Sequence, residues 1–132
     1  MIPRDTPAGM NNCGIAVVAM LAGVTYTDAL MRFIRLCGTA ELSTVWDRQR
    51  VLESFGLTVQ EEVHYRIKPT LTQWINNQYD PTFDYHLTLT GHAIAVRKHM
   101  LFDQRYTNGI SALRSPYKRK RVMSYHNLGE TR

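Results

Sequence analysis

The feature that most constrains this chain is an apolar stretch near its start, from Cys13 to Gly23. Small residues recur through it, at Ala16, Ala19 and Ala22. A helix that is apolar on every side must be buried, and glycine is the usual residue just after a helix ends. A membrane span would need about 20 apolar residues, which this stretch does not reach. We therefore expect residues 13–23 to form a buried helix.

The next part of the chain predicts further helices. Thr25 to Asp28 offer caps for a second helix, whose apolar stripe is Ala29, Leu30, Phe33 and Ile34. A third helix is expected from Ser43 to Phe55, capped by Ser43 or Thr44 and ended by Gly56. Residues 57–65 predict a strand, and residues 70–77 a short helix after Pro69.

From Tyr85 the apolar residues follow the period of two that is typical of strands. Strands are expected at residues 85–89, 92–96, 100–103 and 122–125, with a turn at Asn108-Gly109. Helices that precede strands in this way are typical of an α+β fold. At 132 residues the chain is expected to be one domain spanning 1–132.

The positive charge of the chain is concentrated late in the sequence. The net charge is +5, and Arg114 together with residues 118–121 supplies five positive charges, so the other 11 basic and 11 acidic residues cancel. A dedicated nucleic-acid-binding fold usually spreads basic residues over a whole face, which argues against that class. Within the basic segment 114–121 we expect Lys118, Arg119, Lys120 and Arg121 to be exposed, either as a solvated run or as a contact for an acidic partner or nucleic acid.

The cysteine and histidine patterns exclude several classes of protein. Cys13 and Cys37 are too few for a disulfide framework and match no zinc spacing, so we expect free thiols, no metal and no cofactor. Residues 1–12 lack the features of a signal peptide, and we expect a cytoplasmic protein that contacts no membrane. Cys37 is expected to be an inert core thiol. Ordinary surface or strand positions are expected for His64, His86, His99 and His126.

Cys13 differs from a core cysteine because it opens the apolar helix. A helix N-terminus carries partial positive charge and unpaired N–H groups, both of which stabilise a thiolate. Asn11 and Asn12 suit the turn before the helix, and their amides are possible oxyanion donors. Gly14 follows directly, and glycine in a first helical turn is costly unless some group must approach closely. Cys13 is therefore the candidate nucleophile.

A cysteine nucleophile needs a base, and the base needs an orienting group. His92 begins a predicted strand, and Asp103 ends the next one. A hairpin between these strands would bring Asp103 beside His92, where it would hold one imidazole tautomer and stabilise the imidazolium. The residues therefore predict a Cys13–His92–Asp103 triad.

The stretch from Asn12-Cys13-Gly14 through Met20-Leu21-Ala22-Gly23 resembles the nucleophile helix of papain-like cysteine peptidases. The closest resemblance is to the bacteriocin-processing, double-glycine-leader peptidases and their small bacterial and phage relatives. Gly91-His92 and Phe102-Asp103 follow in the order of that family, and the resemblance covers about residues 6–109. It implies a papain-like fold, with N-terminal helices packed on a C-terminal antiparallel sheet, and an intracellular thiol hydrolase, either a peptidase or an amidase. By analogy with these relatives, a phage origin would place the protein in the host cytoplasm.

Two departures from that family keep an alternative open. Asn12 replaces the usual acid before the cysteine, and Pro7 stands near the place of an upstream glutamine that acts as oxyanion donor. Asn11 or Thr6 would have to substitute for that glutamine. The leading hypothesis is a hydrolase of a protein or peptide substrate. The alternative is a catalytically inactive papain-like module that binds a host or partner protein.

Overall fold

The computed structural model describes residues 2–7, 13–38 and 43–132. Helices come first: α1 (Cys13–Ala22), α2 (Tyr26–Cys37) and α3 (Val45–Ser54), with the shorter α4 (Leu71–Asn77) later. The strands are β1 (Val63–His64), β2 (Phe83–Leu89), β3 (His92–Arg97), β4 (Met100–Phe102), β5 (Ile110–Ser111) and β6 (Val122–Glu130), with a 3-10 turn at Ala112–Arg114. They form one antiparallel sheet in the order β1-β6-β2-β3-β4-β5. The predicted α+β class is confirmed.

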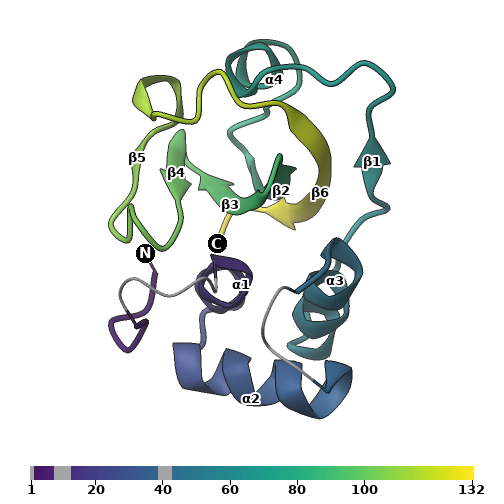
Figure 1. The fold of residues 1–132 in the computed structure, drawn as a ribbon, viewed down its shortest axis with the longest axis vertical. Helices are drawn as coiled ribbons and strands as arrows, with labels where there is room; N and C mark the ends of the chain where they lie inside the picture. The colour runs from purple at the N-terminus through teal and green to yellow at the C-terminus, as the bar shows by residue number, and fades with distance from the viewer. Residues whose placement is uncertain (1, 8–12, 39–42) are drawn as a thin grey trace.

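The sheet lies between two layers, as Figure 1 shows, with α1, α2 and α3 on one side and α4 on the other. The core on the side of α1 gathers α1 with Phe33, Leu52, Ala95 and Phe102. The core on the side of α4 is built around Trp74, with Leu87, Ile94 and Val96. Side chains thus alternate along β3, as the period of two predicts: Ala95 packs against α1, and Ile94 and Val96 pack on the side of α4.

The predicted helix starts are confirmed by side-chain caps. The Thr25 hydroxyl accepts a hydrogen bond from the Asp28 N–H at 3.0 Å. Thr44, and not Ser43, caps α3, and Asp47 completes a capping box with it. Thr70 caps α4 in the same way. Each hydroxyl satisfies an N–H group that the first helical turn leaves without a partner.

The strand expected at residues 57–65 is wrong for most of its length, since only Val63–His64 is a strand. Leu57 and Val59 pack into the core beside α1 while the chain crosses from α3 to the sheet. Only Val63 and His64 reach the ladder of β6, where they pair with Tyr125 and Ser124. Apolar residues such as Leu57 and Val59 leave the same sequence pattern whether they pack against helices or belong to a paired strand.

β6 runs five residues beyond the expected end at Tyr125, from Val122 to Glu130. Burial alternates along it, but two of its inward positions hold Ser124 and His126. Polar residues at inward positions hide the alternation that marks a half-buried strand. Its pairing with the whole of β2 determines its length.

Residues 118–121 have exposed side chains, as expected, but their backbone belongs to the fold. The Leu71 and Thr72 N–H groups at the start of α4 donate to the Lys120 and Lys118 carbonyls at 2.9 and 3.1 Å. The Thr90 N–H donates to the Arg121 carbonyl at 3.2 Å. The segment therefore joins α4 to the β2–β3 turn through main-chain hydrogen bonds.

We predict that replacing all four residues 118–121 with serine leaves the melting temperature nearly unchanged. Their side chains are exposed, and exposed charged contacts contribute about 0–1 kcal/mol each. Thermal unfolding followed by circular dichroism measures the effect. Lys120→Pro is the contrasting variant and should lower the melting temperature, because it removes the Lys120 N–H that donates to the Tyr117 carbonyl at 2.8 Å. A large drop in the melting temperature of the serine variant would show that these side chains stabilise the fold.

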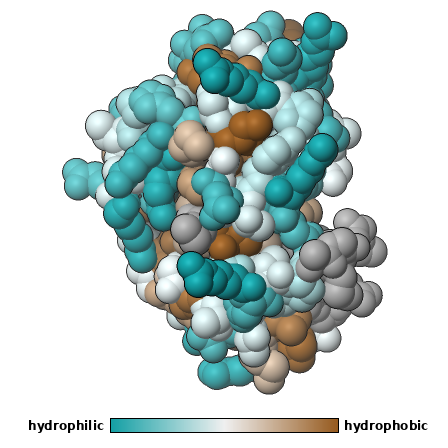
Figure 2. Space-filling model, turned by 90° about the vertical axis from the view of Figure 1, so that its left-hand side faces the viewer, coloured by the Kyte–Doolittle hydropathy of each residue, from teal (hydrophilic) through white to brown (hydrophobic). Residues whose placement is uncertain are grey.

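The apolar surface of α1 packs in the core. No single helix in the described ranges is long and apolar enough to cross a membrane, and α1 and α2 would meet that length and composition only together, across a 111° bend. α1 is buried from Gly14 to Leu21. On the face shown in Figure 2, hydrophilic residues cover most of the surface, with apolar residues in small areas between them.

Candidate active site

Cys13 is the first residue of α1, and its thiol is partly covered. The eight residues that follow it, Gly14 to Leu21, are buried. A helix packed on all sides holds its first residue in a fixed place. The first N–H groups of α1 have no partner within the helix, so they are available to a negatively charged sulfur or oxygen beside Cys13.

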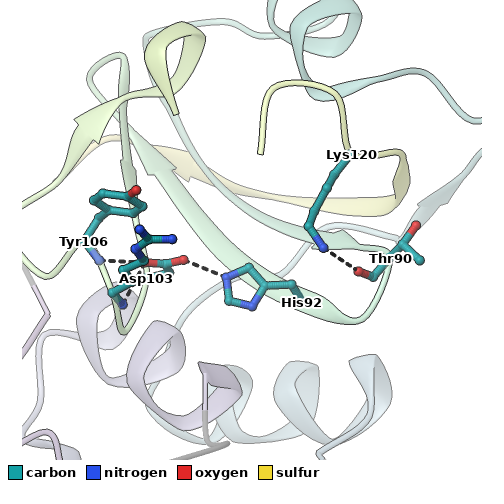
Figure 3. A network of polar contacts seen from close by, with 6 residues as sticks. Thr90, His92, Asp103, Tyr106 and Lys120 are labelled. Atoms are coloured by element: carbon teal, nitrogen blue, oxygen red, sulfur yellow. Dashed lines mark hydrogen bonds and ion pairs between the residues drawn. The ribbon is translucent and has the colours of Figure 1, made fainter. Parts of the chain in front are cut away.

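His92 and Asp103 meet as the predicted hairpin requires. His92 begins β3, and Asp103 follows β4, its antiparallel neighbour. Figure 3 shows their contact, in which Nε2 of His92 lies 2.6 Å from Oδ2 of Asp103. The Asp103 side chain is 0% exposed, so this carboxylate is available to His92 and not to solvent.

The rest of the Asp103 carboxylate is also satisfied. Oδ1 accepts hydrogen bonds from the Arg105 and Tyr106 N–H groups at 2.9 and 2.7 Å. Burial raises the pKa of Asp103, but the hydrogen bonds from His92, Tyr106 and the Tyr117 side chain outweigh burial and lower it. Asp103 is therefore an ionised group that orients the imidazole.

The thiol of Cys13 and the imidazole of His92 shift each other's pKa. Burial raises the pKa of Cys13, but the His92 side chain, the Ala93 backbone and the charges of His92 and Arg48 outweigh burial and lower it below its ordinary value. Burial lowers the pKa of His92, but hydrogen bonds with Asp103 and Cys13 raise it to about 9. Because Asp103 engages Nε2, Nδ1 is the nitrogen left to face the thiol. Both shifts favour a thiolate–imidazolium pair.

Tyr117 is a site residue that sequence reasoning missed. Its ring centroid lies 4.9 Å from that of His92, and its side chain hydrogen-bonds to Asp103. Burial and the hydrogen bond to Asp103 raise the pKa of the Tyr117 hydroxyl, so it stays a donor. The only signal for Tyr117 in the sequence is its place directly before the basic residues 118–121. The charges of that run give no indication that an aromatic ring beside it contacts His92.

Arg48 of α3 is the second residue that sequence reasoning missed. Its side chain is buried, with the residue 6% exposed. Nε donates to Nε2 of His86 at 2.9 Å, Nη1 to the Ser43 carbonyl at 2.6 Å, and Nη2 to the Thr88 hydroxyl at 3.2 Å. All of these partners are uncharged. A buried cation without a carboxylate partner is costly, and the charge of Cys13 is the largest that stabilises the Arg48 guanidinium.

The close approach of Ser43 and Arg48 to the start of α1 explains why residue 14 is glycine. A Cβ at this position would lie 2.3 Å from Oγ of Ser43 and 3.1 Å from Cδ of Arg48. The close approach that the sequence predicted at Gly14 is therefore made by a serine hydroxyl and an arginine side chain. Any larger residue here would displace the Ser43 hydroxyl and crowd the Arg48 side chain.

His86 and His126 are strand residues, as expected, but neither is ordinary. Both are 0% exposed, their rings are stacked, and their Nδ1 atoms lie 3.1 Å apart. Burial lowers the pKa of His86 well below its ordinary value, and the charge of Arg48 adds to this. A neutral His86 can accept from Arg48, so the pair is a buried support for that guanidinium. His64 and His99 are exposed, as expected.

The two predicted oxyanion donors have different outcomes. Asn11 lies outside the described residues. The Thr6 hydroxyl is buried and has no hydrogen-bond partner among the residues that the structure describes. Near Thr6, Gln104 Nε2 donates to the Pro7 carbonyl at 2.6 Å. This hydrogen bond holds Pro7 beside the part of the chain that directly follows Asp103.

A groove of about 690 Å³ opens between the start of α3, β1 and the β2–β3 turn. It is lined by the start of α3, including the exposed Trp46, by residues around β1, and by the β2–β3 turn through Gly91. Its lining includes Gly91, the residue before His92, but not Cys13, His92 or Asp103. Trp46 lines the groove, whereas Trp74 lies in the core.

The remaining thiol is unlike Cys13. Burial and the charge of Asp47 raise the pKa of Cys37, so it is a weaker nucleophile at neutral pH. Among the described residues no group of three or more His, Cys, Asp or Glu side chains is arranged to hold a metal ion.

Comparison with protein-family models, with curated proteins and with solved structures found no match to this chain. The geometry of Cys13, His92 and Asp103 is therefore the observation that bears on function.

Proposed function

We propose that this protein is a papain-like cysteine hydrolase, a peptidase or amidase, that uses Cys13, His92 and Asp103. The observation that carries the proposal is the 2.6 Å contact between Nε2 of His92 and the buried carboxylate of Asp103. The Cys13 thiol is coupled to the same imidazole, since each group shifts the pKa of the other. A nucleophile, a base and an orienting acid in this order make up the arrangement that activates a thiol. A free thiol of this kind suits a reducing compartment such as the cytoplasm.

The reaction follows from these positions. The Cys13 thiolate attacks the substrate carbonyl carbon, a C–S bond forms, and the carbonyl oxygen gains negative charge. The first N–H groups of α1 stabilise that oxygen. His92 gives the proton on Nδ1 to the leaving nitrogen as the C–N bond breaks. Neutral His92 then takes a proton from water, the resulting hydroxide attacks the thioester, and the carboxylic acid product leaves with regeneration of the thiolate.

We predict that iodoacetamide alkylates Cys13 rapidly at about pH 6, where Cys37 reacts slowly. The pKa of Cys13 is lowered and that of Cys37 is raised, so Cys13 has the larger fraction of thiolate in mild acid. Peptide mass spectrometry after timed quenching measures both sites in one sample, and Cys37 is the internal control. Equal, slow labelling of the two cysteines would contradict the proposal.

The competing function is an inactive module on a hydrolase scaffold, which the absence of the upstream glutamine favours. Cys13→Ala separates the two functions once a biological effect of the protein is measured. The hydrolase loses that effect completely with Cys13→Ala, whereas a binding module keeps it.

A further inference from the structure

Two cations lie on either side of the His92–Asp103 pair. Lys120 Nζ is 3.5 Å from the Thr90 carbonyl, two residues before His92, and Figure 3 shows this contact beside the imidazole. Arg105 follows Asp103 closely, since its N–H donates to Oδ1 of that residue, and its guanidinium carbon lies 5.3 Å from the Tyr106 ring centroid. Both residues are exposed, so their charges are open to a bound molecule.

Further positive charges extend this edge of the site. We define the cationic rim as the two residues above with their neighbours in the basic segment: Arg105, Lys118, Arg119, Lys120 and Arg121. The main-chain hydrogen bonds from α4 and Thr90 hold residues 118–121 in place beside the β2–β3 turn. Because the backbone is fixed, the charges are a permanent feature of the edge of the site.

The cations of the rim are not neutralised within the part of the chain that the structure describes. The one ion pair there between an arginine or lysine and an acid is Arg97 with Asp84, and no rim residue takes part in one. Asp103, whose carboxylate accepts from the Arg105 N–H, is buried and engaged by His92. A concentration of one sign of charge at the edge of a site raises the local concentration of oppositely charged ligands.

We propose that the substrate of this site is an acidic peptide segment, whose carboxylates bind the cationic rim while the bond to be cleaved lies over Cys13. This inference rests on the proposed hydrolase function and specifies its substrate class. A peptide fits better than a nucleic acid because the charges lie beside the His92–Asp103 pair, which the proposed function assigns to chemistry at an acyl carbon. Nucleic-acid binding usually takes basic residues over a whole face, whereas the rest of this chain has balanced charge.

The test compares two alkylating reagents that differ in charge. Iodoacetate carries a carboxylate and iodoacetamide does not, so the ratio of their rate constants at Cys13 reports the charge around the thiol. We expect the ratio to fall about threefold or more in Arg105→Ser/Lys120→Ser, because two attracting charges are lost. The iodoacetamide rate should stay close to that of the wild type. Raising the salt concentration should lower the ratio for the wild type more than for this variant.

The matched control is Arg35→Ser/Arg50→Ser, which removes two exposed charges from α2 and α3 and should leave the ratio unchanged. An unchanged ratio in the rim variant would overturn the proposal. Binding of a random-sequence DNA duplex that is lost in the rim variant, together with an unchanged ratio, would overturn it in favour of nucleic acid. Failure of the hydrolase function gives a different result, which is slow labelling of Cys13 by iodoacetamide itself.

Discussion

Replacement of His92 by alanine is expected to slow iodoacetamide labelling of Cys13 at about pH 6 by tenfold or more. The imidazolium supplies a hydrogen bond and a positive charge that lower the pKa of the thiol. A rise of one pKa unit reduces the thiolate about tenfold in the pH range below the pKa. Labelling rates measured across pH for both proteins give the two thiol pKa values directly.

The shape of the wild-type profile is also predicted. Labelling should rise as Cys13 ionises, below the ordinary pH range of a thiol, and should change again near pH 9, where His92 loses its proton. The ion pair stabilises the folded protein between these limits. The contribution of His92, whose pKa is raised, is lost as the pH rises through about 9, and that of Cys13, whose pKa is lowered, is lost as the pH falls through its folded value.

Asp103→Asn should give an intermediate labelling rate. The amide keeps an oxygen for the Arg105 and Tyr106 N–H groups but removes the negative charge that raises the pKa of His92. Cys37 is the control in every sample, and its rate should not change. A Cys13 pKa that is the same in the wild type and in His92→Ala would show that the two side chains do not act together.

Arg48→Met is expected to raise the pKa of Cys13 and to slow its labelling at about pH 6 severalfold or more. The guanidinium is buried near the start of α1, where solvent screens its charge poorly. The same variant leaves Nε2 of His86 without its donor, which costs about 1–3 kcal/mol of folding stability. Labelling profiles measure the first effect and thermal unfolding measures the second.

Arg48→Lys separates charge from structure. Lysine keeps the positive charge but cannot donate to Ser43, Thr88 and His86 in the same fork geometry. The lysine variant should therefore recover much of the labelling rate while it remains less stable than the wild type. Arg32→Met is the matched control, since Arg32 contacts Ser54 and Phe55 on the other side of the helices. Equal loss of labelling in Arg48→Met and Arg48→Lys would assign Arg48 a purely structural role.

The order of the elements and the identity of the proposed triad were predictable because their signals are local. The apolar run after Cys13 predicts a buried helix, and a threonine three residues before an acid or amide predicts the starts of α2, α3 and α4. A strand that begins at His92 and a second that ends at Asp103 need only a hairpin to bring the two together. Each of these inferences depends on neighbours within a few residues.

What only the tertiary structure decided is the environment of the thiol. Arg48, Tyr117 and His86 come from three distant segments, and no spacing in the sequence indicates that they gather near Cys13. The buried histidines have the same local signature as exposed ones, because burial of a polar residue depends on the partners that the fold supplies. The basic segment shows the same division. Its charge was evident from the sequence, but its position beside His92 follows from main-chain hydrogen bonds to α4 and Thr90, which form only after distant parts of the chain have packed.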